Sequence, residues 1–241
     1  MTPRLLANAR VRLALVALMA GGSLLAIGGC DPRTLVYFLQ PFEPTIAPPC
    51  GEDLTFQGKK VVILCRAVAD SMGENSSIER DLSRDVGAIL RKKVKKITVV
   101  DPDKVATWVE AHPKETDPAE LARDFDADIV IFLEVERFQT QSPGDLNMIH
   151  GQAKVHIKAF EMDYPKNSKG KPIKDQPKEA HDIYDDYAEP SFPERGALPI
   201  DSGSSRSKFR ITFIKVVAKE ISWHFIEHAP DDSIQDSRIE R

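Results

Sequence analysis

The sequence lacks the patterns that carry most known enzyme chemistry. It has three cysteines in 241 residues and no Cys-x-x-Cys pair, no glycine-rich loop that would cradle a phosphate, and no Ser-His-Asp order. It has no stretch that repeats at a fixed period, which argues against a solenoid. Nucleophilic catalysis therefore has no support in the sequence.

Excess basic charge is also lacking. The formal net charge is −4, and residues 1–29 contain three arginines but no acidic residue, so the chain without them carries −7. Such a balance provides no basic face for nucleic acid, and none is expected as a partner. Hydrophobic residues make up 41% and charged residues 29%, which is typical of a globular chain and excludes disorder throughout.

The first 29 residues have the pattern of a secretory signal peptide. Arg4, Arg10 and Arg12 precede the uncharged run LALVALMAGGSLLAIGG, which contains four glycines and is shorter than the ~20 apolar residues that a membrane span needs. The run ends at Cys30 in the tetrapeptide IGGC, which resembles the bacterial lipobox. The resemblance implies cleavage before Cys30 and a lipid on its thiol, which would anchor the protein stably. An ordinary signal peptide cut near Gly29 is the alternative.

Residues 30–58 are predicted to be a proline-rich tether between the lipidated cysteine and the folded domain. Asp31 resembles the signal that retains some lipoproteins in the inner membrane, and the choice between inner and outer membrane stays open. In the oxidising envelope Cys50 and Cys65 either form a disulfide or leave Cys65 as a small buried strand residue. The sequence does not decide between them.

A mixed α/β (α+β) domain is predicted over residues 59–228, followed by a polar tail over 229–241. The apolar run 59–68 indicates a buried strand, and residues 76–96 indicate a helix with a Ser76-x-x-Glu79 capping box and an apolar face. Asp101-Pro102 and Asp117-Pro118 begin two further helices. The remaining predictions are strands at 97–101, 126–138, 153–162 and 179–189, loops at 139–151, 164–178 and 190–205, and a helix at 207–228.

The order of these elements predicts a single mixed β-sheet packed by helices. The helix before ITVVDPDKV and the segment DPAELARDFDADIVIFLEVERF resemble the envelope lipoproteins related to CsgG, LpoB and the amino-terminal domain of TolB. Ala122, Ala127, Asp128 and Ile131 match the A-x-x-x-x-A-D-x-x-V/I pattern of that group. The resemblance covers about residues 59–162 and implies a scaffold, adaptor or activator in the periplasm.

Two sets of side chains are candidate sites. His224 and His228 are four residues apart in a predicted helix, the spacing of a zinc pair, but no third ligand is evident and exposed histidines at a helix end are the simpler interpretation. Glu134 and Glu136 share a strand face, but we interpret them as the solvated side of that strand rather than as an acid/base pair, so they are not counted as a candidate site. The second set is basic, lies on the strand 153–162 and the loop 164–178, and is our predicted partner-binding surface: Lys154, His156, Lys158, Lys166, Lys169, Lys171 and Lys174.

From the sequence we therefore expect a lipid-anchored protein on the periplasmic side of the bacterial envelope. We expect it to act without a cofactor, as a binding, scaffold or assembly factor for an envelope protein partner, with a homo-oligomer as one form of assembly. The alternative is an envelope hydrolase or metal-dependent enzyme whose site is not visible in the sequence.

Overall fold

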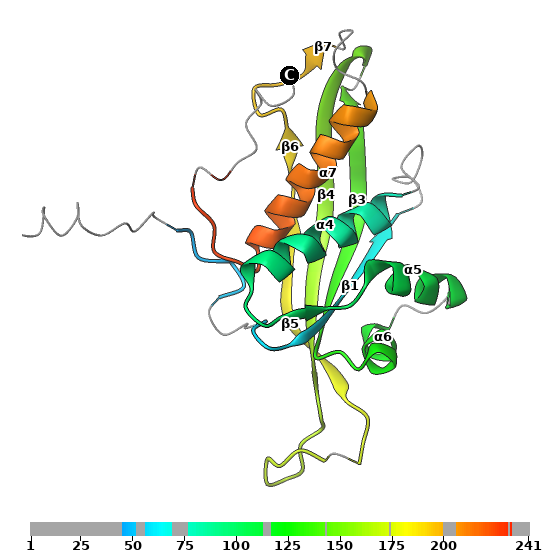
Figure 1. Ribbon diagram of the computed structural model, residues 1–241, viewed down its shortest axis with the longest axis vertical. Helices are drawn as coiled ribbons and strands as arrows, with labels where there is room; N and C mark the ends of the chain where they lie inside the picture. The colour runs from blue at the N-terminus through cyan, green and yellow to red at the C-terminus, as the bar shows by residue number, and fades with distance from the viewer. Residues whose placement is uncertain are drawn as a thin grey trace, which may run out of the picture. The chain divides into compact units, whose positions relative to one another are not determined.

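A mixed seven-stranded sheet forms the centre of the computed structural model (Figure 1). The structure describes residues 45–51, 56–68, 77–112, 117–142, 144–173, 175–199, 206–230 and 232. Five strands run in the order β2-β1-β3-β4-β5, and β6 and β7 both pair with β4. The strands are β1 (Lys60–Ala67), β2 (Thr98–Val99), β3 (Ile129–Ser142), β4 (Asp145–Asp163), β5 (Glu179–Ala188), β6 (Ser191–Phe192) and β7 (Leu198–Pro199).

Four helices are present among the described residues: α4 (Ile78–Lys93), α5 (Pro102–Ala111), α6 (Pro118–Phe125) and α7 (Arg206–Trp223). The prediction of a mixed sheet packed by helices is confirmed. Asp101 and Asp117 cap α5 and α6 as predicted, each accepting a hydrogen bond from a backbone N–H two residues on. The predicted capping box differs: the Glu79 carboxylate accepts from the Ala67 N–H at 2.7 Å, and Ser76 lies outside the described residues.

The strands β2, β1 and β3 are parallel, and the central residues of β1 are buried on both faces of the sheet. β1 pairs with β3 from Val61–Ile129 to Ala67–Val135 and with β2 at Lys60–Thr98. Alternate β1 residues enter two separate core clusters, with Ile63 in the larger and Leu64 in the smaller. This explains the continuous apolar run in the sequence, since a strand covered on both faces has no side chain for solvent.

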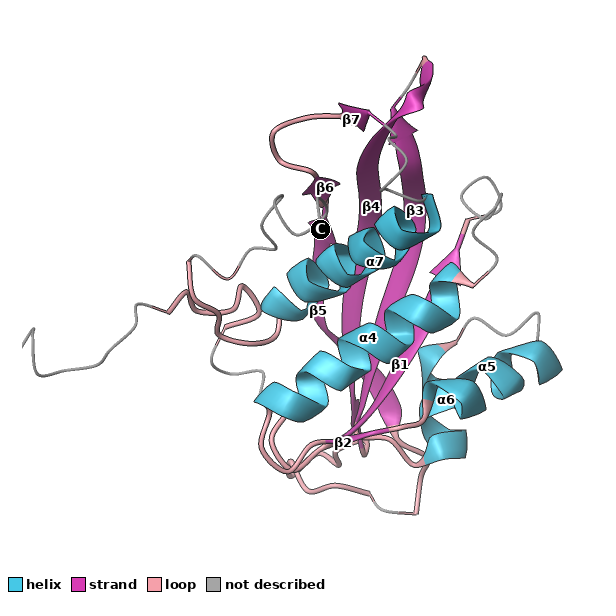
Figure 2. Cartoon of the chain, turned by 45° about the horizontal axis from the view of Figure 1, so that its top comes forward, coloured by secondary structure: helices cyan, strands magenta, loops and turns pink. Residues whose placement is uncertain are grey.

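Helices α4 and α7 lie across one face of the sheet (Figures 1 and 2). The α4 residues Ile78, Leu82, Val86 and Leu90 are all at most 1% exposed, as their spacing predicts. α7 approaches β4 closely at Gly151, where a Cβ atom would lie 2.5 Å from the ring of Phe213. On the other face α5 and α6 cover β1 and the nearby ends of β3, β4 and β5.

Several boundaries differ from the prediction. β3 and β4 extend through residues 139–142 and 145–151, which were predicted to be loop, and the 190–205 segment contains β6 and β7. Ile46 pairs with His228 and Phe56 is 2% exposed, so residues that were assigned to the tether join the domain. The predicted signal peptide, Cys30 and most of the tail lie outside the described residues. Among those described, no helix is long and apolar enough to span a membrane.

Candidate functional site

One face of the sheet carries charged side chains where no described helix covers it. On β3, β4 and β5, the residues that alternate with the core positions point to this side. The cross-strand register places Glu134 opposite His156, and His156 opposite Tyr187. We call this surface the polar sheet face and define it by Glu134, Glu136, Lys154, His156, Lys158, Asp185 and Tyr187.

The polar and charged side chains of the polar sheet face contact one another in pairs. Lys154 Nζ lies 2.7 Å from Glu136 Oε2, and His156 Nε2 lies 2.6 Å from Asp185 Oδ1. Asp185 also receives Lys158 Nζ at 3.5 Å. The hydrogen bond from His156 lowers the pKa of Asp185, and the hydrogen bond to Glu136 raises the pKa of Lys154. The face is thus held in one charge pattern rather than presenting free lysines.

Tyr187 forms the aromatic centre of this face. Its ring stacks on the His156 ring with centroids 4.3 Å apart and planes 7° apart, and Lys154 Nζ lies 4.6 Å from the tyrosine ring. Tyr187 is 43% exposed, whereas the His156 side chain is 14% exposed. A half-buried histidine on the neighbouring strand therefore stacks against the exposed aromatic ring.

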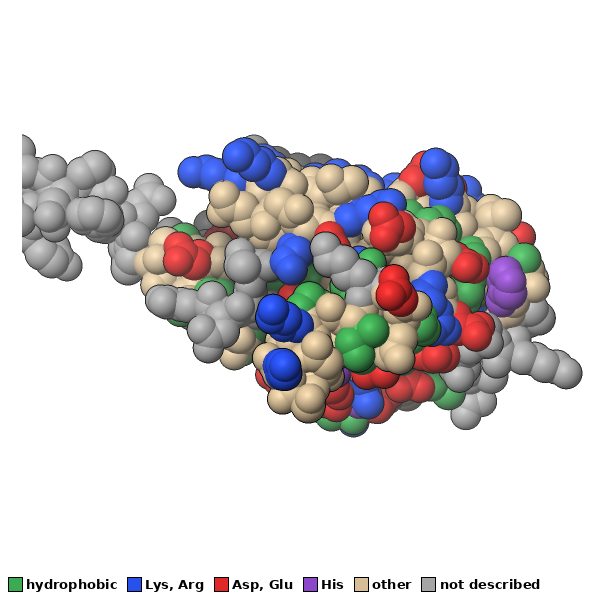
Figure 3. All heavy atoms as spheres, turned by 90° about the horizontal axis from the view of Figure 1, so that it is seen from below, with side chains coloured by type: hydrophobic (Ala, Val, Ile, Leu, Met, Phe, Trp, Pro, Cys, Tyr) green, Lys and Arg blue, Asp and Glu red, His purple; other side chains and the backbone are tan. Residues whose placement is uncertain are grey.

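The predicted partner-binding lysines are divided between this face and the β4–β5 hairpin. Lys154, His156 and Lys158 come together as predicted. Lys166, Lys169 and Lys171 project from the hairpin, whose turn is closed by Asn167 Oδ1 accepting from the backbone N–H groups of Lys169 and Lys171. Figure 3, which views the hairpin end, shows basic side chains interspersed with acidic ones. Lys174 lies outside the described residues.

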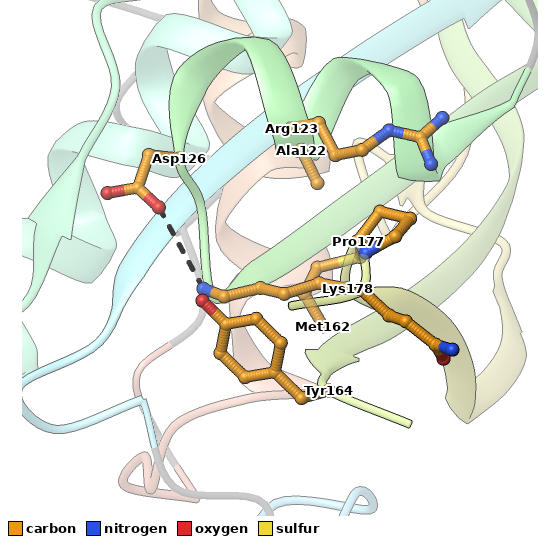
Figure 4. A pocket seen from close by; sticks show the side chains of 8 residues that line it. Ala122, Arg123, Asp126, Met162, Tyr164, Pro177 and Lys178 are labelled. Atoms are coloured by element: carbon orange, nitrogen blue, oxygen red, sulfur yellow. Dashed lines mark ion pairs between the residues drawn. The ribbon is translucent and has the colours of Figure 1, made fainter. Parts of the chain in front are cut away.

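A hollow of about 220 Å³ lies at the base of this hairpin (Figure 4). Lys178 crosses it, with Nζ 3.4 Å from Asp128 Oδ1 and 3.9 Å from Asp126 Oδ1, and 5.9 Å from the Tyr164 ring. Asp128 also accepts from the Lys60 N–H at 2.9 Å, so its carboxylate ties β1 to the hairpin. These contacts brace the hairpin against α6 and β1.

The two histidines proposed as a weak metal pair do not share a helix face. α7 ends at Trp223, so the helical spacing on which the pairing rested does not apply. His224 Nδ1 lies 2.6 Å from the Tyr184 hydroxyl, while His228 stacks on Trp223 at 4.4 Å. No group of three metal-ligating side chains occurs within the part of the chain that the structure describes.

Cys50 and Cys65 are free thiols in the structure. Burial raises the pKa of both, and the Glu79 carboxylate adds to the effect at Cys65. A buried thiol with a raised pKa is a poor nucleophile because the thiolate is the reactive form. Neither cysteine is therefore placed as a catalytic group.

Sequence reasoning missed the partners of the predicted basic residues. Glu134 and Glu136 were interpreted as solvated, and within the predicted strand 179–189 neither Asp185 nor Tyr187 was assigned a role. Their alignment depends on a bulge in the β4–β5 register between Ala159 and Phe160. The alternation of a single strand does not reveal such a shift.

No family model matches the sequence, and no curated protein is significantly similar to it. The chain shows likeness to several solved structures, among them the following three. PelC from Paraburkholderia phytofirmans, a dodecamer, is 13% identical with a TM-score of 0.36, covering 74% of this chain and 95% of its own. Lipoprotein GNA1162 from Neisseria meningitidis is 12% identical with a TM-score of 0.37, covering 68% of this chain and 98% of its own. The hypothetical protein CT253 from Chlamydia trachomatis is 15% identical with a TM-score of 0.38, covering 69% and 98%. Likeness at this level does not assign a function.

Proposed function

We propose that this chain is a lipid-anchored protein of the bacterial envelope that binds a partner protein through the polar sheet face and catalyses no reaction. The observation that carries the binding role is the exposed Tyr187 ring, held in place by His156 and Lys154. The anchor is inferred from the signal pattern that ends at Cys30.

A pre-ordered aromatic ring favours protein binding for an energetic reason. Tyrosine is enriched among the residues that contribute most to interfaces. Ordering a side chain on association costs about 0.5–1.5 kcal/mol, and stacking on His156 meets part of that cost before a partner arrives. The alternating charges around the ring would select a partner with the complementary pattern.

The anchor is tested by replacing Cys30 with alanine. We expect the variant to leave the membrane fraction after a high-salt wash, since it would lack the acyl chains that hold the protein. A Cys30→Ala protein that still fractionates with membranes after the wash would contradict the anchor.

The binding face is tested by photo-crosslinking from position 187 in intact cells. A benzophenone amino acid at Tyr187 keeps an aromatic ring there. The matched control is Ile211, which is 53% exposed on α7 on the opposite side of the sheet. We expect a discrete adduct from position 187 and none from 211. The mass of the adduct separates a different envelope protein from a second copy of this chain.

A charge exchange sharpens the same test. The double variant Glu136→Lys/Lys154→Glu retains an ion pair between these positions but inverts its direction. We expect unchanged folding and a strongly reduced adduct from position 187. Equal crosslinking with the exchanged charges would remove the polar sheet face as the binding surface, and stoichiometric zinc in the purified protein would favour the metal-dependent alternative.

A further inference from the structure

A second basic surface lies where α4 leads into β2. Lys92, Lys93, Lys95 and Lys96, which we call the basic end, surround the carboxyl terminus of α4 and are all exposed. None of them is in an ion pair with a described residue. By contrast, six other lysines each face a carboxylate: Lys59, Lys154, Lys158, Lys166, Lys178 and Lys219.

The basic end borders a hollow of about 280 Å³ between α4 and the end of α7. Lys92 and Lys93 line one side, and Trp223 and His228 line the other. The Trp223 and His228 rings are stacked with planes 14° apart, and Lys219 Nζ lies 5.7 Å from the indole. Glu227 and Asp232 also line the hollow, and Asp232 is neutralised by Lys219 at 2.6 Å. Positive charge is therefore in excess there.

The chain enters the domain beside this hollow. The Ile46 N–H donates to the His228 carbonyl oxygen at 2.7 Å, and the Cys50 N–H donates to that of His224 at 3.3 Å. Figures 1 and 2 show the carboxyl ends of α4 and α7 next to the segment 45–51. The segment that would lead back to a lipid on Cys30 thus starts at the rim of the basic end.

Chain length sets how far this rim can stand from the bilayer. Residues 30 to 45 span at most about 50 Å when fully extended. A tether of that length confines the domain near the surface without fixing which side faces it. Lysines beside an anionic leaflet each contribute about 1 kcal/mol of attraction, and tryptophan favours the headgroup region.

We propose that the basic end docks onto the phosphate headgroups of anionic phospholipids in the membrane that carries the protein. This inference rests on the proposed lipid anchor, which brings the two surfaces together. Docking through this surface, which lies on the α4 and α7 side of the sheet, leaves the polar sheet face on the other side free for a partner. The four lysines are then neutralised by lipid rather than by protein.

The test uses a chain that begins at residue 31 and carries neither signal peptide nor lipid. Both core clusters lie within residues 56–226, so this chain retains the whole described fold. Binding is measured to phosphatidylcholine vesicles with and without phosphatidylglycerol, at low and high salt. In a Trp108→Phe background Trp223 is the remaining tryptophan, and its emission reports entry into the headgroup region.

Two variants with equal loss of charge are compared. The basic-end variant is Lys92→Gln/Lys93→Gln/Lys95→Gln/Lys96→Gln, and the hairpin variant is Lys166→Gln/Lys169→Gln/Lys171→Gln/Lys174→Gln. We expect salt-sensitive binding to phosphatidylglycerol vesicles with a blue shift of Trp223. The basic-end variant should bind at least about tenfold more weakly, since each lysine contributes roughly a fivefold factor, and the hairpin variant should bind nearly as well as the parent. Matching circular dichroism spectra and melting curves establish that both variants fold.

Three results overturn the proposal: no binding to anionic vesicles, equal weakening in the two variants, or release of the protein from vesicles by inorganic phosphate at the concentration of the lipid. The first would leave the lipid anchor untouched, because Cys30→Ala fractionation measures the anchor in cells. Conversely, a Cys30→Ala protein that stays with the membranes would contradict the lipid anchor but would not affect the vesicle measurements, because the chain used there carries no lipid.

Discussion

Replacing Gly151 with alanine is expected to destabilise the fold by wedging α7 away from β4. An alanine Cβ would lie 2.5–2.7 Å from three ring atoms of Phe213, closer than carbon atoms approach without contact strain. Phe213 is fully buried, and its ring is held by Phe138 at 5.1 Å and Phe209 at 6.3 Å between centroids. The ring therefore has neighbours on both sides that limit how far it can move.

The size of the effect follows from two opposing contributions. Overpacking a core by one methyl group costs about 1–3 kcal/mol. Glycine within a strand is itself less favourable than alanine by about 0.5–1 kcal/mol, which offsets part of the cost. The net loss should be about 1–2 kcal/mol, and a domain of this length then melts about 2–8 °C lower.

Urea unfolding of the chain from residue 31 measures this loss, and Gly87→Ala serves as the matched control. A Cβ at Gly87 on α4 would meet Val99 at 3.3 Å, a contact that a small shift relieves, and alanine raises helix propensity. Combining Gly151→Ala with Phe213→Leu makes room for the methyl group, so the double variant should be more stable than the two single losses predict. Additivity within about 0.5 kcal/mol would refute the packing argument.

Two further predictions concern pH and the hairpin. Burial, with a smaller contribution from the Glu194 carboxylate, raises the pKa of Glu220 from its usual range to about 7. The neutral form of Glu220 is favoured in the folded state, so its contribution to the free energy of unfolding is full below the unfolded-state pKa and is lost as the pH rises through 7. Glu220→Gln should therefore raise the urea midpoint near about pH 8 and change it little near about pH 5. A midpoint equally raised at both values would contradict this. Replacing residues 166–172 with a Gly-Ser turn should change the unfolding free energy by less than about 0.5 kcal/mol, because the side chains there are exposed; a larger loss would show that the turn supports the fold.

The elements with a strong period were predictable from the sequence. The α4 core positions, the aspartate caps of α5 and α6 and the alternating half of β4 follow from local patterns that packing reinforces. The extension of β3 and β4 was missed because residues 139–152 are mostly polar and do not alternate cleanly. Pro143-Gly144, a turn dipeptide, was the signal that would have placed a hairpin there.

The end of α7 shows how a correct pattern gives a wrong boundary. Ile214, Val217, Ala218, Ile221 and Phe225 are all buried, as a continuous helix predicts, yet Phe225 is buried from the turn that follows Trp223. Hydrophobic spacing alone does not separate the two. The charge pairs of the polar sheet face were hidden for another reason, since they depend on which residues of three strands stand opposite one another.

The edges of the sheet determine how copies of this protein behave when crowded on one membrane. Among the described strands, β5 has a neighbour on one side only, and β2 at the other edge is two residues long. The open β5 edge carries the acidic residues Asp182 and Asp186, beside Asp185 with its partners His156 and Lys158, and like charges brought face to face across two such edges repel. This acidic edge opposes the edge-to-edge pairing of sheets that leads to aggregation. Neighbouring molecules can therefore gather at high density without merging their sheets.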